Sequence, residues 1–111
     1  MRNSISTHPE EYFYWPVNGD SMAPHIVDGD RALVHKQPSV ESGQLAVVAV
    51  GGEDWAIRKI VKGEDGITLQ QFNPAYEPRV IEAGKVTIAG LVVETERFFV
   101  EPEVWAEMQG V

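Results

Sequence analysis

Apolar and β-branched residues occur along this chain in short runs separated by turn-forming residues. The runs cover 12–17, 31–35, 45–50, 55–62, 67–72, 79–81 and 86–94. Runs of this length that recur about every 8–12 residues are typical of β-strands, and nothing in them favours long amphipathic helices. The pattern predicts an all-β fold, built from small, strongly curved antiparallel sheets with few short helical turns.

Turn signals refine this prediction. The letters GGED at 51–54 predict a hairpin between two apolar runs, and EDG at 64–66 predicts the next one. A single helical turn is expected over 22–26, a short strand over 97–100, and a helix over 102–108 that starts at Pro102. Residues 1–11 are polar and are expected to form a flexible remnant or linker before one domain at 12–111.

Composition restricts the function. The 111 residues include seventeen acidic and nine basic side chains, for a net charge of −8. Such a surface repels phosphate backbones, so the chain is not expected to bind DNA by itself. The absence of cysteine excludes disulfides and thiolate-bound metals, and we expect no metal or cofactor. No signal peptide or membrane span is apparent, which predicts a cytoplasmic protein with no membrane partner.

One serine stands on a turn rich in glycine and aspartate. The letters NGDSMAP at 18–24 place Ser21 between Asp20 and Met22, and DGD follows at 28–30. A serine held this way can attack a carbonyl carbon while backbone N–H groups of the turn stabilise the developing oxyanion. The same residue types also form ordinary turns, so the motif alone leaves both interpretations open.

Four segments in the same order resemble the LexA-like serine peptidases. They are GDSMAP at 19–24, DGD at 28–30, ALVHK at 32–36 and FNP at 72–74. The family comprises the C-terminal self-cleaving domains of LexA, of lambda-type phage repressors and of UmuD, and the resemblance runs from about residue 14 to about residue 97. Type I signal peptidases share a Ser-Met-x-Pro motif, but they normally carry a membrane anchor.

A serine nucleophile needs a base, and the histidines are weak candidates. His8 lies in the polar start, His25 has no evident acidic partner, and His35 belongs to a half-exposed strand, so we interpret all three as surface or half-buried residues. The resemblance implies instead a Ser–Lys dyad. In such a dyad, apolar surroundings lower the pKa of a lysine until its amine is neutral. That lysine is expected on the strand at 55–62.

The register of this strand leaves the base undecided. The family pattern is an aliphatic residue, the catalytic lysine, a basic residue and another aliphatic residue. Anchored on the FNP segment, this pattern aligns with 57–60. The position of the lysine therefore falls on Arg58, and Lys59 takes the next, ancillary position. Arginine cannot act as a general base because it stays protonated. Either a β-bulge near 54–55 turns Lys59 toward Ser21, or Arg58 fills the lysine's place and cleavage is lost.

The resemblance also implies partners. The family cleaves Ala-Gly or Cys-Gly bonds that precede the serine, whereas Ala83-Gly84 and Ala89-Gly90 both follow Ser21, and neither is expected to be a substrate. We expect a homodimer, with 88–93 and 97–100 as candidate pairing surfaces. DNA would be contacted only through an N-terminal domain absent from this chain, and an activated recombinase filament would be the co-protease.

Three hypotheses follow. The first is a self-cleaving domain of a LexA- or phage-type repressor in the SOS response, with Ser21 as nucleophile and Lys59 as base. The second is a non-cleaving dimerisation module in which Arg58 replaces that base. The third is a UmuD-like accessory protein of a polymerase.

Overall fold

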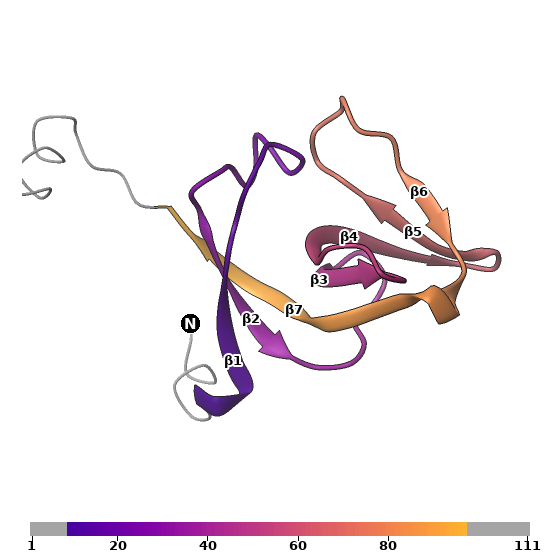
Figure 1. Ribbon diagram of the computed structural model, residues 1–111, viewed down its shortest axis with the longest axis horizontal. Coiled ribbons are helices and arrows are strands. Elements are labelled where there is room, and N and C mark those ends of the chain that lie inside the picture. The colour runs from indigo at the N-terminus through magenta and orange to yellow at the C-terminus, as the bar shows by residue number, and fades with distance from the viewer. Residues whose placement is uncertain (1–8, 98–111) are drawn as a thin grey trace, which may run out of the picture.

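A computed structural model describes residues 9–97 of the chain, and strands account for about half of this segment. After a 3-10 turn at Pro9–Glu11, the strands follow one another as β1 (Tyr12–Pro16), β2 (Arg31–Lys36), β3 (Leu45–Val50), β4 (Ala56–Gly63), β5 (Gly66–Gln70), β6 (Arg79–Ile81) and β7 (Val86–Glu96). All of them pair antiparallel in the order β1-β2-β7-β3-β4-β5-β6 (Figure 1). The predicted all-β fold is confirmed.

The long strand β7 joins two parts of the sheet. Its second half pairs with β2 and its first half with β3, and a register shift interrupts each ladder. Such bulges bend a strand and increase its twist. The seven strands therefore form one strongly bent sheet, where the sequence suggested several small ones, because β7 is eleven residues long and reaches both parts (Figure 1).

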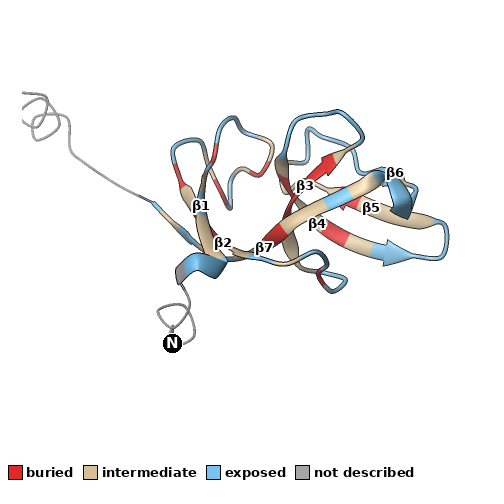
Figure 2. Cartoon of the chain, turned by 60° about the horizontal axis from the view of Figure 1, so that its bottom comes forward, coloured by how far each residue is buried: buried red, intermediate tan, exposed pale blue. Residues whose placement is uncertain are grey.

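The bent sheet buries two apolar clusters. One contains Val34, Val47 and Ile57 with residues of the serine turn, and the other contains Val48 and Ile60. Side chains alternate across a strand, so neighbouring residues of β3 and β4 supply both clusters. Figure 2 shows the buried segments along β2, β3, β4 and the middle of β7, while the hairpin turns are exposed.

Most predicted element boundaries lie within two residues of the observed ones. The expected helical turn at 22–26 is a hydrogen-bonded turn, in which the Ile26 N–H donates to the Met22 carbonyl at 3.0 Å. Ala83–Lys85 forms a short 3-10 turn, and Ala89-Gly90 lies inside β7, an interior strand of the sheet. The strand expected at 97–100, apart from its first residue, and the helix expected at 102–108 lie outside the described residues, as does most of the proposed linker.

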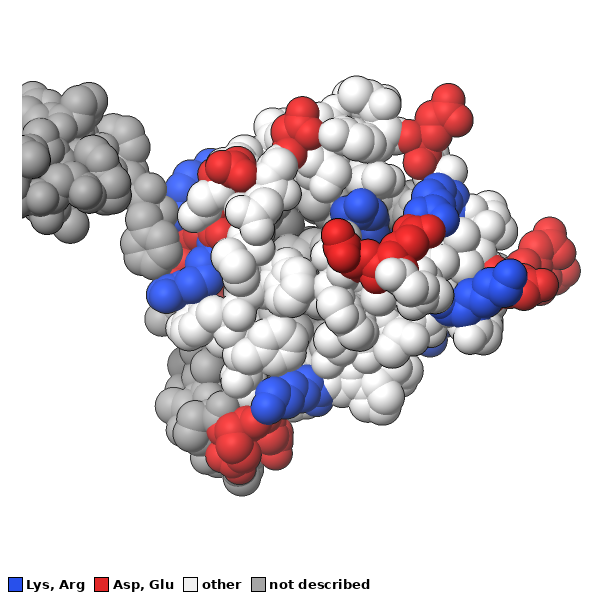
Figure 3. All heavy atoms as spheres, viewed as in Figure 1, with Lys and Arg blue, Asp and Glu red and all other residues white. Residues whose placement is uncertain are grey.

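Charge is spread over the surface of the described residues. On the face in Figure 3, basic side chains are interspersed with acidic ones and do not form one extended basic patch. In the part of the chain that the structure describes, no helix is long and apolar enough to cross a membrane.

Candidate functional site

The turn that carries Ser21 is fixed by its own backbone. Gly19 adopts a φ of +86°, which favours glycine, and its N–H donates to a carboxylate oxygen of Asp28 at 2.7 Å. The Ala23 N–H donates to the Asp20 carbonyl at 3.1 Å. These bonds close the loop on both sides of the serine, so the position of Ser21 is set by local hydrogen bonds.

Asp30 anchors the base of the same loop. Its side chain is 3% exposed, and it accepts hydrogen bonds from the Val27 N–H at 2.9 Å and from the Arg97 guanidinium at 2.9 and 3.0 Å. Its backbone carbonyl accepts from the Val17 N–H at 2.9 Å. The ion pair with Arg97 lowers the pKa of the Asp30 carboxyl, although burial acts in the opposite direction. The second aspartate of the DGD motif is therefore structural.

Replacing Arg97 by methionine is expected to make the domain more sensitive to acid. A carboxyl group with a depressed pKa in the folded state stabilises the fold above its unfolded pKa, and this stability is lost as the pH falls through the folded pKa. Without Arg97, the pKa of Asp30 rises, so the midpoint of acid unfolding moves to higher pH. Circular dichroism during acid titration measures this shift. Arg79→Met, which removes an exposed pair with Glu53, is the control and should leave the midpoint nearly unchanged.

The loop after β5 clamps the serine turn from the other side. The Asn73 N–H donates to the Ser21 carbonyl at 3.0 Å, and its side-chain amide donates to the Asp20 carbonyl at 2.8 Å. The Tyr76 hydroxyl donates to the Asp20 carboxylate at 2.7 Å, which raises the pKa of Tyr76. The FNP segment and the serine motif, about fifty residues apart in sequence, thus form one structural unit.

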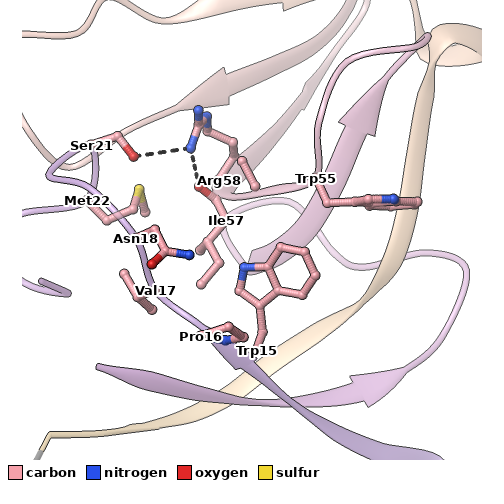
Figure 4. Close-up of a pocket in the computed structure, with 10 residues that line it drawn as sticks. Trp15, Pro16, Val17, Asn18, Ser21, Met22, Trp55, Ile57 and Arg58 are labelled. Atoms are coloured by element: carbon pink, nitrogen blue, oxygen red, sulfur yellow. Dashed lines mark hydrogen bonds between the residues drawn. The ribbon is translucent and has the colours of Figure 1, made fainter. Parts of the chain in front are cut away.

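Strand β4 brings Arg58 to the serine. Its Nη1 lies 3.4 Å from Ser21 Oγ, a long hydrogen bond, and donates a shorter one of 2.6 Å to the Ile57 carbonyl (Figure 4). Arg58 pairs across the sheet with Ala46 of β3. The guanidinium is thereby held over the hydroxyl by its own strand.

Serine and arginine share a cavity of about 100 Å³. Its apolar walls are formed by Trp15 at the end of β1, by Trp55 just before β4, and by Pro16, Val17, Met22, Ala56 and Ile57. Figure 4 shows the side chains of Trp15 and Trp55 on one side of the site, and Ser21 with the Arg58 guanidinium on the other. Burial lowers the pKa of Arg58, and the charge of Arg79 acts in the same direction. A guanidinium nevertheless stays protonated in proteins, so the group beside Ser21 is a cation.

The other candidate bases lie elsewhere. Lys59 pairs with Leu45 and Gln70, and the β3–β4 ladder has no register shift between Ala56 and Lys59. The His25 ring contacts Phe72 at 4.5 Å, and His35 bonds Gln37 and Glu11. Among the described residues, Arg58 alone of these candidates makes a side-chain hydrogen bond to Ser21. His8 lies outside them.

In the part of the chain that the structure describes, no candidate base is placed to accept the proton of Ser21. A serine hydroxyl attacks efficiently only if a neighbour takes its proton, and a guanidinium cannot do so. One of the two alternatives, a β-bulge near 54–55 that turns Lys59 inward, finds no support in the β3–β4 ladder, which is unshifted from Ala56 to Lys59. The roles of Ser21, Lys59, Asp20 and Met22 in catalysis remain predictions.

Several residues of the site escaped sequence reasoning. Trp15 was assigned only to an extended run, yet its indole lines the cavity, and Tyr76 and Arg97 anchor the serine loop from distant segments. Asp28 and Asp30 had a local signal, because aspartates in tight turns commonly accept backbone N–H bonds. The contacts of Tyr76 and Arg97 have no such signal, since they depend on the strand order.

An all-β domain that holds a serine on a clamped glycine turn, against a basic residue of a hairpin strand, is peptidase-like. The model of the Peptidase S24-like family matches residues 1–93. The chain belongs to this family.

Similar proteins are LexA repressors. The LexA repressor of Citrifermentans bemidjiense is 44% identical over 84 residues, which cover 73% of this chain and 41% of that protein. The LexA repressor of Geobacter sp. strain M21 is 43% identical over 84 residues, which again cover 73% of this chain and 41% of that protein. That of Koribacter versatilis is 33% identical over 88 residues, which cover 78% of this chain and 42% of that protein. The chain spans about two fifths of the length of these relatives.

Proposed function

We propose that this chain is the C-terminal domain of a LexA-type transcriptional repressor, and that it pairs two polypeptides without cleaving them. The observation that carries the proposal is the guanidinium of Arg58, 3.4 Å from Ser21 Oγ, at the position where the family resemblance calls for a lysine. The similarity to LexA repressors supports the regulatory role. Contact with DNA, and any place in the SOS response, would come through another part of the full repressor.

A self-cleaving domain is the competing function. It would need a neutral amine within hydrogen-bonding distance of Ser21, and Lys59, the neighbour of Arg58 on β4, is the candidate. The unshifted ladder along β4 argues against Lys59, because adjacent strand residues point to opposite faces. A UmuD-like accessory role rests on the family resemblance alone.

Pairing would use a side-chain surface of β7. This strand lies between β2 and β3, so in the region that pairs with them its backbone is not free to add a strand from a second copy. Val93 lies at the register shift between β2 and β7 and is 39% exposed. An exposed valine on a bulge of a central strand suits a small apolar contact between two copies. The second candidate surface, 97–100, lies outside the described residues except for Arg97.

Sedimentation or light scattering tests this proposal. The full chain is expected to run at twice its mass of 12.3 kDa at micromolar concentration. Val93→Glu should shift it to the monomer, because a desolvated carboxylate opposes an apolar contact. Val80→Glu, on the edge strand β6, is the matched control and should leave the dimer intact. A monomeric parent chain, or dissociation by Val80→Glu alone, would contradict pairing through β7.

A further inference from the structure

Arg58 differs from the other described arginines in its partners. Each of those pairs with a carboxylate: Arg31 with Glu96, Arg79 with Glu53, and Arg97 with Asp30. Arg58 instead meets two neutral oxygens, those of Ser21 and Ile57, and forms no ion pair with any acid in the described segment. The chain has a net charge of −8, yet among the described residues this half-buried cation has no acidic partner. A desolvated charge of this kind is stabilised by a bound anion.

The cavity has room for a small anion. Its volume of about 100 Å³ is several times the ~10–15 Å³ that one water molecule needs. A carboxylate group fits such a space. Buried Val17, Met22 and Ile57 give the cavity an apolar wall, and apolar surroundings strengthen a charge-assisted hydrogen bond from the guanidinium.

The shape of the site favours a main-chain group. A serine hydroxyl on a turn of this kind faces the space in which a planar peptide carbonyl would sit. A C-terminal carboxylate is the same planar group with a second oxygen, and it carries the charge that pairs with a guanidinium. We propose that the pocket between Ser21 and Arg58 binds the free C-terminal carboxylate of a peptide. This inference rests on the proposed function, in which Ser21 does not hydrolyse the bound peptide.

Tryptophan fluorescence provides the test, because both indoles at the cavity are reporters. Trp105→Phe removes the remaining tryptophan, and the full chain with this change is titrated at low salt with three short peptides. One ends Leu-Val-Ala with a free carboxylate, the second is its C-terminal amide, and the third is an amide with an internal glutamate. The free acid is expected to bind at least about tenfold tighter than either amide, as a charge-assisted bond requires. Equal binding of acid and amide would overturn the proposal, and equal binding of the internal glutamate would overturn the choice of a chain end.

Substitutions then assign the preference to Arg58. Arg58→Gln should abolish the tenfold preference, while Arg58→Lys, which keeps the charge but not the planar fork, should retain part of it. Arg79→Gln is the matched control, because Arg79 is exposed and already paired with Glu53. If Arg58→Gln unfolds by circular dichroism, the lysine variant decides, measured at a pH low enough to keep its amine charged: a preference retained in part or in full supports the charge, and a complete loss contradicts it. A preference that survives in folded Arg58→Gln overturns the site.

Mass spectrometry of the samples in which Arg58 is unchanged separates the two proposals. Intact peptides with the acid preference support both. Intact peptides without that preference overturn the carboxylate site and leave the non-cleaving function standing. Hydrolysis of the amide peptide at a main-chain bond contradicts the non-cleaving function.

Discussion

Replacing Arg58 by lysine is expected to give the domain peptidase activity that the parent chain lacks. The side chain at this position already reaches Ser21 Oγ, and burial among the pocket residues lowers the pKa of a basic group there. The same desolvation would lower the pKa of a lysine and leave part of it neutral. Since a positioned general base contributes about 10²–10⁴-fold, hydrolysis of an Ala-Gly peptide should rise by about 100-fold or more at alkaline pH. Chromatography of the products measures the rate.

Two controls assign any gain to the engineered dyad. Arg58→Lys combined with Ser21→Ala should return the rate to that of the parent chain, because the nucleophile is then missing. Arg58→Gln should gain nothing, since an amide is no base. If the lysine variant folds and binds the peptide yet hydrolyses it no faster than Arg58→Gln, the geometry of the serine turn is not that of a working nucleophile.

The second large effect concerns Gly90 in the central strand. A Cβ built there would overlap the carbonyl oxygen of His35 and lie 2.7 Å from Cγ1 of Val34. The added Cβ would meet main-chain atoms of β2 as well as a side chain, so β2 and β7 would have to move apart. Gly90→Ala is expected to destabilise the fold by about 1–3 kcal/mol, as overpacking typically does. Urea denaturation measures the change in the free energy of unfolding.

Gly84→Ala is the matched control, because nothing lies within 4 Å of its Cβ position. Its effect should stay within about 0.5 kcal/mol, as for ordinary surface changes. A parent-like stability for Gly90→Ala would mean that β2 and β7 are not held as closely as their pairing indicates. Ala89-Gly90 would then also be more accessible to a protease than its place in the sheet implies.

The strands were predictable because their signals are local. Alternating apolar residues and the GGED and EDG turns set the bounds of β3, β4 and β5 to within two residues. The single sheet was not predictable in this way. It depends on the length of β7 and on bulges where Val93 and Ala89 fall between paired neighbours, and these features arise from packing against two other strands.

In the site, too, local motifs were predictable from the sequence, whereas contacts between distant segments were not. The motif around Ser21 and its likeness to LexA-like peptidases could be read from the sequence, as could the conflict between Arg58 and Lys59. Which of the two side chains approaches the serine depends on strand register, where a shift of one residue exchanges the faces. The clamps from Tyr76 and Arg97 depend on the folded topology, and a single sequence contains no local pattern for them.

The central claim is that Ser21 faces a permanent cation and that no candidate base among residues 9–97 is placed to accept its proton. The most direct measurement is the rate at which the parent chain hydrolyses an Ala-Gly peptide from pH 7 to about pH 10, the range over which a desolvated lysine would become neutral. No turnover above that of the Ser21→Ala variant is expected at any pH in this range. A rate that climbs with pH and disappears in both Ser21→Ala and Lys59→Ala would contradict the claim and identify Lys59 as the base.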